Sequence, residues 1–352
     1  MRLAIITSRA TSLKEVGRGI AYVARAKGFT PIIMEYAPSP VDLKNIARLA
    51  IIVMTMNPLL SRSYFVAARD YNINNIPAWI YTTTEGRLPR RYVKKWMQRD
   101  LSFIANSEYT REKLEEAGLQ VIDVIPHGYI GSDIEKAIGY RETGRSFLEE
   151  KLGKGVIFVT VASGLRRKGH PLLADAISMA INECNDCRFF VLTTPDAYSY
   201  YQGLEGKVYV DTRFGELSRI EVLSIMAAAD WYIQPSLAEG FGLPVLEAQA
   251  LGTPCIHVDY APLNEHSCPC NIRVPWYQIV YDPQGEGIEY ELHMYKPEEM
   301  AKAILRAYDI TVNNSDEYKD ISEKVRKHAE QFEAKKVYSK FFDNIIVYEE
   351  IG

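Results

Sequence analysis

Short apolar runs alternate with longer amphipathic segments along nearly the whole chain, and this alternation is the first guide to the fold. In the first half, apolar runs of strand length lie at Leu3–Thr7, Pro31–Glu35, Ala50–Thr55, Ala78–Thr82, Ser102–Ala105 and Val121–Ile125. Helical patterns separate them, for example at Gly17–Lys27 and Thr110–Ala117. Strands that alternate with helices predict parallel sheets.

The second half repeats this pattern. Its apolar runs lie at Val156–Ala162, Arg188–Thr193, Lys207–Asp211, Trp231–Gln234, Pro254–Val258 and Gln278–Tyr281. Its helical patterns lie at Pro171–Glu183, Ser218–Ala229 and Pro297–Asp309. We therefore expect an α/β protein with two doubly wound, Rossmann-like domains that face each other across a cleft. Ligands of such sheets bind beyond the carboxyl ends of the strands.

The segment SLAEGFGLPVLEAQALG, residues 236–252, carries the candidate chemistry. Seven residues separate its two acids, Glu239 and Glu247, and two glycines, Gly240 and Gly242, follow the first acid. Glycines allow backbone amides to come close to a ligand, because they have no side chain. We expect Glu239 on a loop and Glu247 about one turn inside the helix that follows.

The helix of this segment has clear signals at both ends. Pro244 favours a helix start, because its missing N–H is not needed there, and Gly252 suits the position just beyond the helix end. Free amides at a helix N-terminus favour an anion such as a phosphate. A carboxylate accepts two hydrogen bonds side by side, which suits neighbouring sugar hydroxyls. The segment therefore predicts a site for a nucleotide sugar.

The string EGFGLPVLEAQALGTP resembles the signature of the retaining glycosyltransferases of the GT-B fold, the group 1 family of sucrose-synthase and mannosyltransferase type. This resemblance implies the transfer of a sugar, with retained configuration, from a nucleotide-diphosphate sugar to an acceptor hydroxyl. It also implies an acceptor-side domain over residues 1–140 and a donor domain over residues 141–333. A final helix, at about 334–352, resembles the helix that crosses back to the first domain in this family.

The same resemblance assigns roles to the segment. Glu239 would hold hydroxyls of the donor sugar, and Glu247 would hold the ribose hydroxyls. The remaining donor contacts would come from Gly240, Phe241, Gly242 and Leu243. Phe214 follows a predicted strand and lies where the family contacts the base. The motifs do not decide whether the nucleotide of the donor is UDP or GDP.

Three cations follow the first strand of the second half, in the sequence GLRRKGH. Two or three cations beside a helix N-terminus form a diphosphate site, and fixed cations stabilise the charge that builds up on a leaving diphosphate. Arg166 and Lys168 are the best candidates by resemblance to the family's Arg…Lys-Gly pair, although the choice between Arg166 and Arg167 stays open. Because no Asp-x-Asp motif is present, we predict a reaction without metal and without a further cofactor.

The first half is less typical of the family. Gly17 begins a Gly-Arg-Gly sequence that resembles the family's glycine-bearing loop facing the donor phosphate; the alternative is an ordinary helix start. In many relatives a histidine that contacts the donor sugar occupies the place of YTTTEG, residues 81–86. Here Thr84 or Glu85 could bond a sugar hydroxyl, or the segment is a plain surface loop.

Composition narrows the class of protein. The chain has 352 residues, with 47% hydrophobic and 24% charged residues, as in soluble globular proteins. Its formal net charge of −4 argues against nucleic acid as a partner. No apolar run reaches the roughly 18 residues of a membrane span, and the N-terminus reads as a strand rather than a signal peptide. We therefore expect a cytoplasmic protein.

One segment differs from the rest of the chain in its charge composition. Arg87–Arg99 carries six basic residues and no acid, with Tyr92 and Trp96 one helical turn apart. It is either a solvated basic helix or a peripheral surface for anionic lipid headgroups at the inner membrane face, or for a polyanionic acceptor. The motifs do not show whether the acceptor is a glycan, a lipid-linked molecule or a protein.

The five cysteines do not suggest a secreted disulfide framework. Cys184 and Cys187 form one close pair, and Cys268 and Cys270 form another. Free thiols are the favoured interpretation, while local disulfides and a metal site remain alternatives. Two alternatives to the glycosyltransferase also remain. One is a nucleotide-sugar epimerase or phosphorylase of the same architecture, and the other is a nucleotide-sugar-binding protein without turnover.

Overall fold

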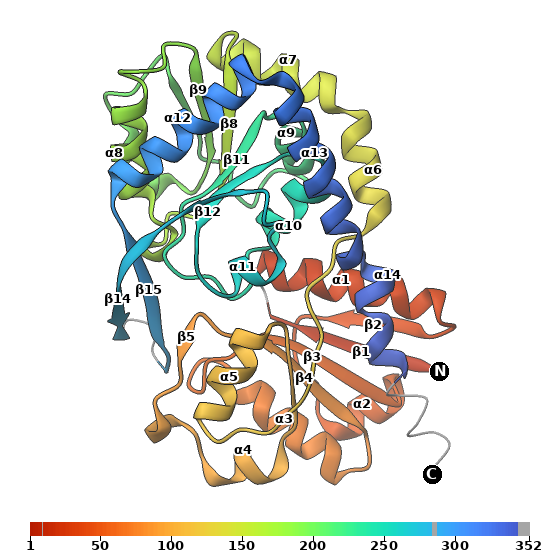
Figure 1. Ribbon diagram of the computed structural model, residues 1–352. Helices are drawn as coiled ribbons and strands as arrows, with labels where there is room; N and C mark the ends of the chain where they lie inside the picture. Colours follow the sequence, from red (N-terminus) through yellow and green to blue (C-terminus); the bar gives the residue numbers. More distant parts are fainter. Residues whose placement is uncertain (9, 284–286, 344–352) are drawn as a thin grey trace.

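The computed structural model describes residues 1–8, 10–283 and 287–343 of the chain. It contains two six-stranded parallel sheets, one above the other in Figure 1, and a three-stranded antiparallel sheet that reaches from one to the other. The two parallel sheets confirm the predicted α/β class. We call the parts that carry them the N-terminal half and the C-terminal half.

The N-terminal sheet has the strand order β2-β1-β3-β4-β6-β7. Its strands are β1 (Arg2–Thr7), β2 (Thr30–Met34), β3 (Leu49–Thr55), β4 (Ala78–Thr83), β6 (Phe103–Ala105) and β7 (Val121–Val124). The helices around it are α1 (Thr11–Ala26), α2 (Pro40–Ile46), α3 (Arg62–Ile73), α4 (Lys95–Asp100) and α5 (Glu108–Glu116). The order reverses between β1 and β3, and ligands of such sheets bind beside this point.

The C-terminal sheet has the order β10-β9-β8-β11-β12-β13 and reverses between β8 and β11. Its strands are β8 (Val156–Val161), β9 (Cys187–Leu192), β10 (Val208–Asp211), β11 (Trp231–Gln234), β12 (Cys255–Val258) and β13 (Ile272–Val274). The helices of this half are α6 (Gly131–Gly139), α7 (Arg141–Leu152), α8 (His170–Ala180), α9 (Arg219–Ala228), α10 (Leu243–Ala250), α11 (Leu263–His266), α12 (Pro297–Asn313) and α13 (Ser315–Ala329).

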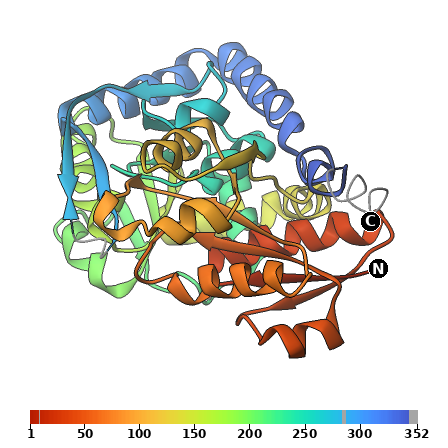
Figure 2. The same ribbon diagram turned by 90° about the horizontal axis from the view of Figure 1, so that it is seen from below.

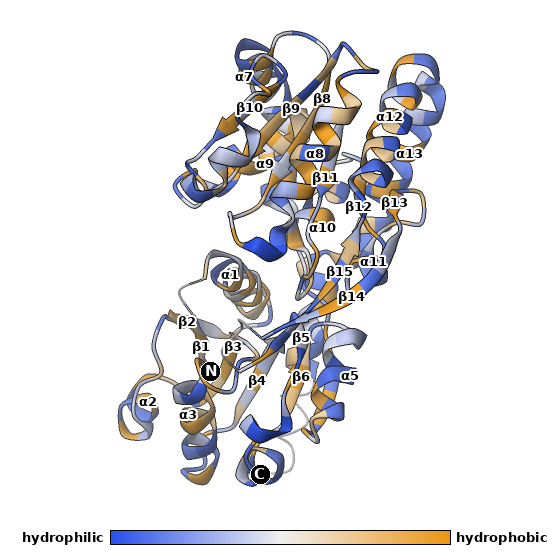
Figure 3. Cartoon of the chain, turned by 90° about the vertical axis from the view of Figure 1, so that its left-hand side faces the viewer, coloured by the Kyte–Doolittle hydropathy of each residue, from blue (hydrophilic) through white to orange (hydrophobic). Residues whose placement is uncertain are grey.

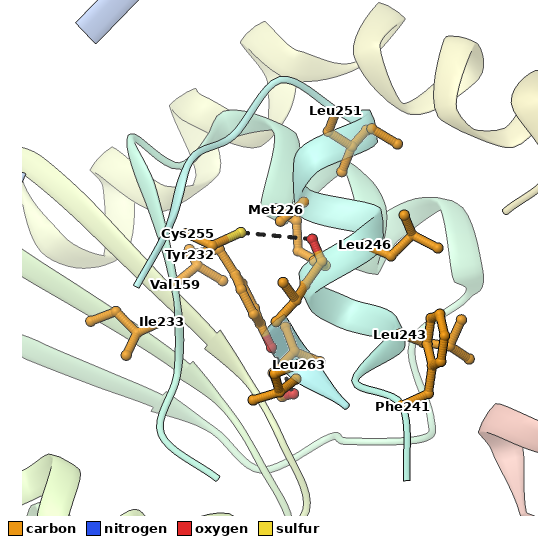
Figure 4. Close-up of a cluster of buried hydrophobic side chains, with 14 of the residues drawn as sticks. Val159, Met226, Tyr232, Ile233, Phe241, Leu243, Leu246, Leu251, Cys255 and Leu263 are labelled. Atoms are coloured by element: carbon orange, nitrogen blue, oxygen red, sulfur yellow. Dashed lines mark hydrogen bonds between the residues drawn. The ribbon is translucent and has the colours of Figure 1, made fainter. Parts of the chain in front are cut away.

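Apolar residues concentrate on the strands of both sheets (Figure 3). Helices cover both faces of a parallel sheet, so its central strands are apolar throughout; all six residues of β8 are buried. Figure 4 shows how this core holds α10: Leu246 of the helix and Leu251, which directly follows it, lie in a cluster with Met226 and Tyr232. The packing fixes the position of α10, the helix of the predicted nucleotide-sugar segment.

The antiparallel sheet joins the two halves. It consists of β14 (Trp276–Asp282), β15 (Glu289–Tyr295) and the two-residue β5 (Gly86–Arg87), in the order β14-β15-β5. The predicted strand at Gln278–Tyr281 therefore belongs to this sheet and not to a doubly wound one. Only Pro275 separates β13 from β14, which leaves no room for the crossover helix that a parallel neighbour needs.

The C-terminal segment joins the halves at the opposite edge, where it lies beside α1 in Figures 1 and 2. The short α14 (Ala334–Val337) packs on α1, and helical backbone continues over residues 339–343. The buried Tyr338 accepts a hydrogen bond at its hydroxyl from the Gly128 amide, at 2.9 Å. Residues 344–352 of the predicted final helix lie outside the described residues.

The basic segment Arg87–Arg99, for which a solvated helix is one of the two interpretations, does not form a single helix. It runs from β5 through a 3₁₀ turn, Arg90–Tyr92, to α4, which begins at Lys95. Extended backbone at Pro89, Val93 and Lys94 interrupts the helical pattern. In the part of the chain that the structure describes, no helix is long and apolar enough to cross a membrane.

The cysteines differ from the favoured prediction of free thiols. The structure joins Cys184 to Cys187 and Cys268 to Cys270, with Cα atoms 5.6 and 5.2 Å apart. Both separations lie in the range that a disulfide spans. Cys255 is a free, buried thiol.

Candidate functional site

The carboxyl ends of the two parallel sheets enclose a cavity of about 440 Å³. The N-terminal half lines it with the start of α1 and with residues at or just beyond the carboxyl ends of β3, β4 and β7. The C-terminal half lines it with the loops after β8, β10 and β11 and with the start of α10. Because both strand orders reverse here, each sheet offers its ligand-binding edge to the same space.

Two cations enter the cavity from a 3₁₀ turn, Arg166–Lys168, between β8 and α8. The Lys168 ammonium lies 2.5 Å from Oε1 of Glu239, which also accepts a 2.7 Å hydrogen bond from Gln234. The Arg167 guanidinium lies 2.8 Å from a carboxylate oxygen of Glu85, which the opposite half contributes. Each of these two cations is therefore paired with one carboxylate of the cavity.

Of the two arginines between which the sequence left the choice open, Arg167 lines the cavity and Arg166 does not. The Arg166 side chain is 74% exposed, and its guanidinium lies 3.9 Å from Asp282. A 3₁₀ turn has three residues per turn, so neighbouring side chains point about 120° apart. Arg167 and Lys168 face the cavity, and Arg166 is left on the outside.

Burial and mutual attraction compete at these four groups. Burial of the Lys168 ammonium, followed by repulsion from Arg167, lowers the pKa of Lys168. Burial disfavours ionised Glu239, but the attraction of Lys168 and Arg167 outweighs it and holds the pKa of Glu239 below its ordinary value. Burial is the stronger effect at Glu85 and raises its pKa despite both cations. Glu239 is thus the carboxylate that the cations hold ionised.

The loop after Glu239 is pressed against the N-terminal half. The carbonyl oxygen of Gly240 accepts hydrogen bonds from the Thr83 hydroxyl at 2.7 Å and from the Asn106 amide at 3.0 Å. A Cβ atom on Gly240 would lie 2.2 Å from the Thr83 hydroxyl oxygen, so only glycine permits this approach. Gly242, with φ of +87°, adopts the left-handed conformation at the N-cap of α10.

The ring of Phe241 lies between two histidines. It stacks on His266 with ring centroids 4.3 Å apart and lies 4.9 Å from the ring of His127. His127 follows β7 and lines the cavity; its Nδ1 lies 2.7 Å from the Tyr81 hydroxyl. Burial, together with the nearby His266, lowers the pKa of His127 to about 3. The N-terminal half thus supplies a neutral imidazole to the cavity from a different strand than the one that sequence reasoning considered.

Glu247 lies inside α10, is buried and lines the cavity together with Gly240, Phe241, Gly242 and Leu243. Both of its oxygens accept hydrogen bonds from the Arg219 guanidinium, at 3.0 and 2.5 Å. Sequence reasoning missed Arg219. One signal was present: a cation in the first turn of a helix is unfavourable beside the helix dipole, so its position there indicates a carboxylate partner.

Two candidate residues of the N-terminal half, Gly17 and Thr84, do not line the cavity. Gly17 is buried in the interior of α1, which begins at Thr11, six residues before the predicted start. A Cβ atom there would lie 2.5 Å from the Thr7 side chain, so Gly17 serves the packing of α1 on β1. The residues of this region that line the cavity are Ala10, Thr11, Ser12, Leu13 and Glu15.

Thr84 is fully buried and donates its hydroxyl hydrogen to the Gly86 carbonyl oxygen, at 2.9 Å. Its neighbours Thr83 and Glu85 line the cavity instead. The cause is the alternation of side chains along extended backbone, which turns residues 83 and 85 to one side and residue 84 to the other. Phe214, the predicted base contact, lines the cavity beside Gly215.

Among the described residues, no group of three or more His, Cys, Asp or Glu side chains is arranged to hold a metal ion. The positively charged side chains that line the cavity are Arg167, Lys168 and Arg219. The cavity can bind an anion through Arg167 and Lys168 and can accept hydrogen bonds from hydroxyls through Glu239 and Glu247.

Comparison with known proteins gives a consistent picture. The family model "Glycosyl transferases group 1" matches residues 153–309. A protein named "Uncharacterized glycosyltransferase 335", from Sulfolobus islandicus rod-shaped virus 1, is 27% identical over 97% of this chain and 100% of its own length.

Two solved structures superpose on the whole chain. A glycosyltransferase from Rickettsia africae has a TM-score of 0.71 and 16% identity, over 99% of this chain and 98% of its own. The Anabaena protein HepE, solved in complex with UDP-glucose, has a TM-score of 0.70 and 12% identity, over 99% of this chain and 100% of its own. At these identities the likeness establishes the fold.

Proposed function

Since the chain belongs to the group 1 glycosyltransferases, retaining enzymes of the GT-B fold that use a nucleotide-sugar donor, we propose that Arg167 and Lys168 bind and stabilise the diphosphate of that donor. The observation that carries the proposal is the pair of cations turned into the cavity beside Glu239, at the start of α10. The sugar then passes from the diphosphate to an acceptor hydroxyl.

The two cations keep hydrogen-bond donors for the phosphate oxygens. A lysine ammonium has three N–H groups, and the hydrogen bond from Lys168 to Glu239 uses one of them. The Nε atom of Arg167 is buried and has no hydrogen-bond partner among the described residues. As the bond to the sugar breaks, negative charge grows on the diphosphate, and cations fixed in a buried site stabilise that charge strongly.

The carboxylates receive the hydroxyl groups of the donor in this proposal. Glu239, held ionised beside Lys168, accepts hydrogen bonds from the donor sugar. Glu247 accepts hydrogen bonds from the ribose, and Phe214 contacts the base. Because side-chain cations neutralise the diphosphate, we propose that the reaction needs no metal ion.

A thermal-shift screen tests the donor site. The ligands are UDP, GDP, ADP and their common sugar conjugates, each with and without EDTA; UDP-glucose comes first because HepE was solved with it. A ligand at a hundred times its dissociation constant adds about 2.7 kcal/mol to the free energy of unfolding. A shift that EDTA leaves unchanged supports the cationic site, and the absence of any shift contradicts it.

Product analysis separates the remaining alternatives. A glycosyltransferase releases the nucleoside diphosphate in proportion to the glycoside formed. An epimerase releases none, and a phosphorylase consumes phosphate. A protein without turnover binds the donor and hydrolyses it no faster than the uncatalysed reaction.

The acceptor surface lies on the N-terminal half in this proposal. Arg90, Arg91 and Lys94, between β5 and α4, and Lys95, the first residue of α4, are exposed. Exposed cations of this kind attract anionic lipid headgroups, which suits a lipid-linked acceptor. Co-sedimentation with anionic vesicles, but not with neutral ones, is the expected result; equal recovery with both kinds of vesicle contradicts the contact.

A further inference from the structure

We propose that Arg219 is a positioning residue of the donor site. Its guanidinium orients Glu247 toward the ribose hydroxyls of the nucleotide and connects Glu247 to Glu15 of the opposite half. The inference rests on the proposed function, because it assumes that a nucleotide binds in the cavity. It adds a residue that no motif of the sequence marks.

The contact between Arg219 and Glu247 fixes the carboxylate in one orientation. Nη1 and Nη2 of Arg219 each bond a different oxygen of Glu247, at 3.0 and 2.5 Å. Such a two-point contact between a guanidinium and a carboxylate sets the plane of both groups. Arg219 itself is held by the start of α9, where Ser218 and Glu221 form a complete capping box.

The contact leaves Glu247 able to bind a ligand. Each carboxylate oxygen can accept two hydrogen bonds, and the two-point contact uses one on each. Both Glu247 and Arg219 line the cavity, so the unused positions are available to a molecule there. Two oxygens side by side, each with one free position, match the two neighbouring hydroxyls of a ribose.

Arg219 also contacts the N-terminal half. Its Nε atom lies 3.5 Å from Oε2 of Glu15, a residue of α1 that lines the same cavity. Glu15 is held in place by Arg18, which bonds the same oxygen at 2.7 Å and also pairs with Asp133 of α6. A chain of charged side chains therefore runs from Glu247 through Arg219 to α1. The nucleotide's ribose would be bound by a carboxylate whose orientation depends on both halves.

The alternative is that the pair of Arg219 and Glu247 only stabilises the fold. Removing one partner of a buried ion pair destabilises a protein whether or not the pair has another role. Stability alone therefore does not distinguish the two, and the test must measure how well the site recognises a ribose hydroxyl.

The test compares nucleotides with and without the ribose 2′-hydroxyl. We measure the dissociation constants of UDP and 2′-deoxy-UDP, and of GDP and 2′-deoxy-GDP, for the wild-type protein and for Arg219→Gln. The wild type should prefer the ribose form by about tenfold, since one hydrogen bond to a charged group contributes about 1.5 kcal/mol. Arg219→Gln should bind the ribose form about tenfold more weakly and should bind the two forms within about threefold of each other.

Two further variants keep the result interpretable. Arg145→Gln removes a guanidinium of similar exposure, 30% against 26% for Arg219, from its ion pair with Asp230 outside the cavity. It should leave the preference for ribose unchanged. Arg219→Lys keeps the charge but loses the two-point contact, so it should lose the preference even if Arg219→Gln does not fold.

The outcomes separate this inference from the proposed function. Loss of the ribose preference in the Arg219 variants but not in Arg145→Gln, with the donor KM raised more than kcat is lowered, supports the positioning role. A preserved preference in the Arg219 variants overturns it while leaving nucleotide binding intact. If the wild type binds none of these nucleotides, the proposed function fails, and the inference fails with it.

Discussion

At the scale of the residue, the site depends on which of three consecutive cations faces the cavity. Lys168 and Arg167 do so, while Arg166 is exposed on the same turn. Replacing Lys168 by Ala should lower kcat by about 100-fold to 1,000-fold, because the departing diphosphate loses a fixed positive charge. Steady-state turnover with a saturating donor measures this.

Arg166→Ala is the matched control, since it removes one charge from the same turn. Its kcat should stay within about twofold of the wild-type value, because an exposed cation is screened by solvent. Near-normal turnover of Lys168→Ala would refute the diphosphate role of Lys168.

Glu247 leads to a different expectation, because it is assigned to the ribose and not to the reacting bond. Glu247→Ala should weaken the binding of the nucleoside diphosphate by about tenfold or more, with a smaller effect on kcat at saturating donor. Isothermal titration with UDP and GDP measures the affinity. An affinity equal to that of the wild type would leave Glu247 with a purely structural role.

Residues of the motif could be placed from the sequence, and residues outside it could not. Glu239, Glu247 and Lys168 lie in the cavity because a local pattern of glycine, proline and charge fixes the backbone around them. Thr84 does not line the cavity because side chains alternate along extended backbone, and Gly17 does not because α1 begins six residues before the predicted start. The partner of Glu247 lies 28 positions earlier in the chain, and no local rule connects the two.

At the scale of the element, β5 depends on a glycine. A Cβ atom on Gly86 would lie 2.0 Å from the carbonyl oxygen of Glu289 on the neighbouring β15. Gly86→Val should therefore break the pairing of β5 with β15 and lower the free energy of unfolding by about 1–3 kcal/mol. Urea unfolding measures the loss, and hydrogen exchange should show weaker protection of the β15 amides.

Gly139→Ala is the control for this variant, because a Cβ atom on Gly139 has no atom within 4 Å among the described residues. Its stability should stay within about 0.5 kcal/mol of the wild-type value. Equal protection of β15 in Gly86→Val and in the wild type would show that the pairing tolerates a side chain at this position.

Most long elements follow from the periodic pattern, whereas the connection between the halves does not. The predicted strands at Ala50–Thr55 and Trp231–Gln234 agree with β3 and β11 within one residue, because buried parallel strands are continuously apolar. β5 has only two residues and no periodicity, and its partner β15 comes about 200 residues later. Such a strand exists only through its partner, so the sequence around it does not predict it.

At the scale of the whole molecule, buried neutral histidines make stability depend on pH. Burial lowers the pKa of His127 to about 3 and, at the C-terminal half, lowers the pKa of His257 and of His266 to about 4. In the unfolded chain these groups bind protons near pH 6.5, so between that pH and their folded values the unfolded state holds more protons. The contribution of these neutral histidines to the free energy of unfolding is therefore fully present above pH 6.5 and decreases as the pH is lowered.

Each such histidine contributes a slope of about 1.4 kcal/mol per pH unit in its window. His127→Gln should therefore lose less stability than the wild type between pH 7 and pH 5, by about 2 kcal/mol. Urea unfolding at both pH values measures the difference. Parallel loss in the two proteins would show that protonation of His127 does not contribute.

The pairing of β5 with β15 also decides how this enzyme can be recombined with its relatives. A chimera cut at the chain crossing near residue 130 would give the new N-terminal half a hairpin that it has not been matched to, and the hairpin would lose its own edge strand, β5. The exchangeable unit is therefore a discontinuous one, in which residues 276–295 travel with the N-terminal half. Any exchange of the N-terminal half with that of a relative should therefore transplant both segments together.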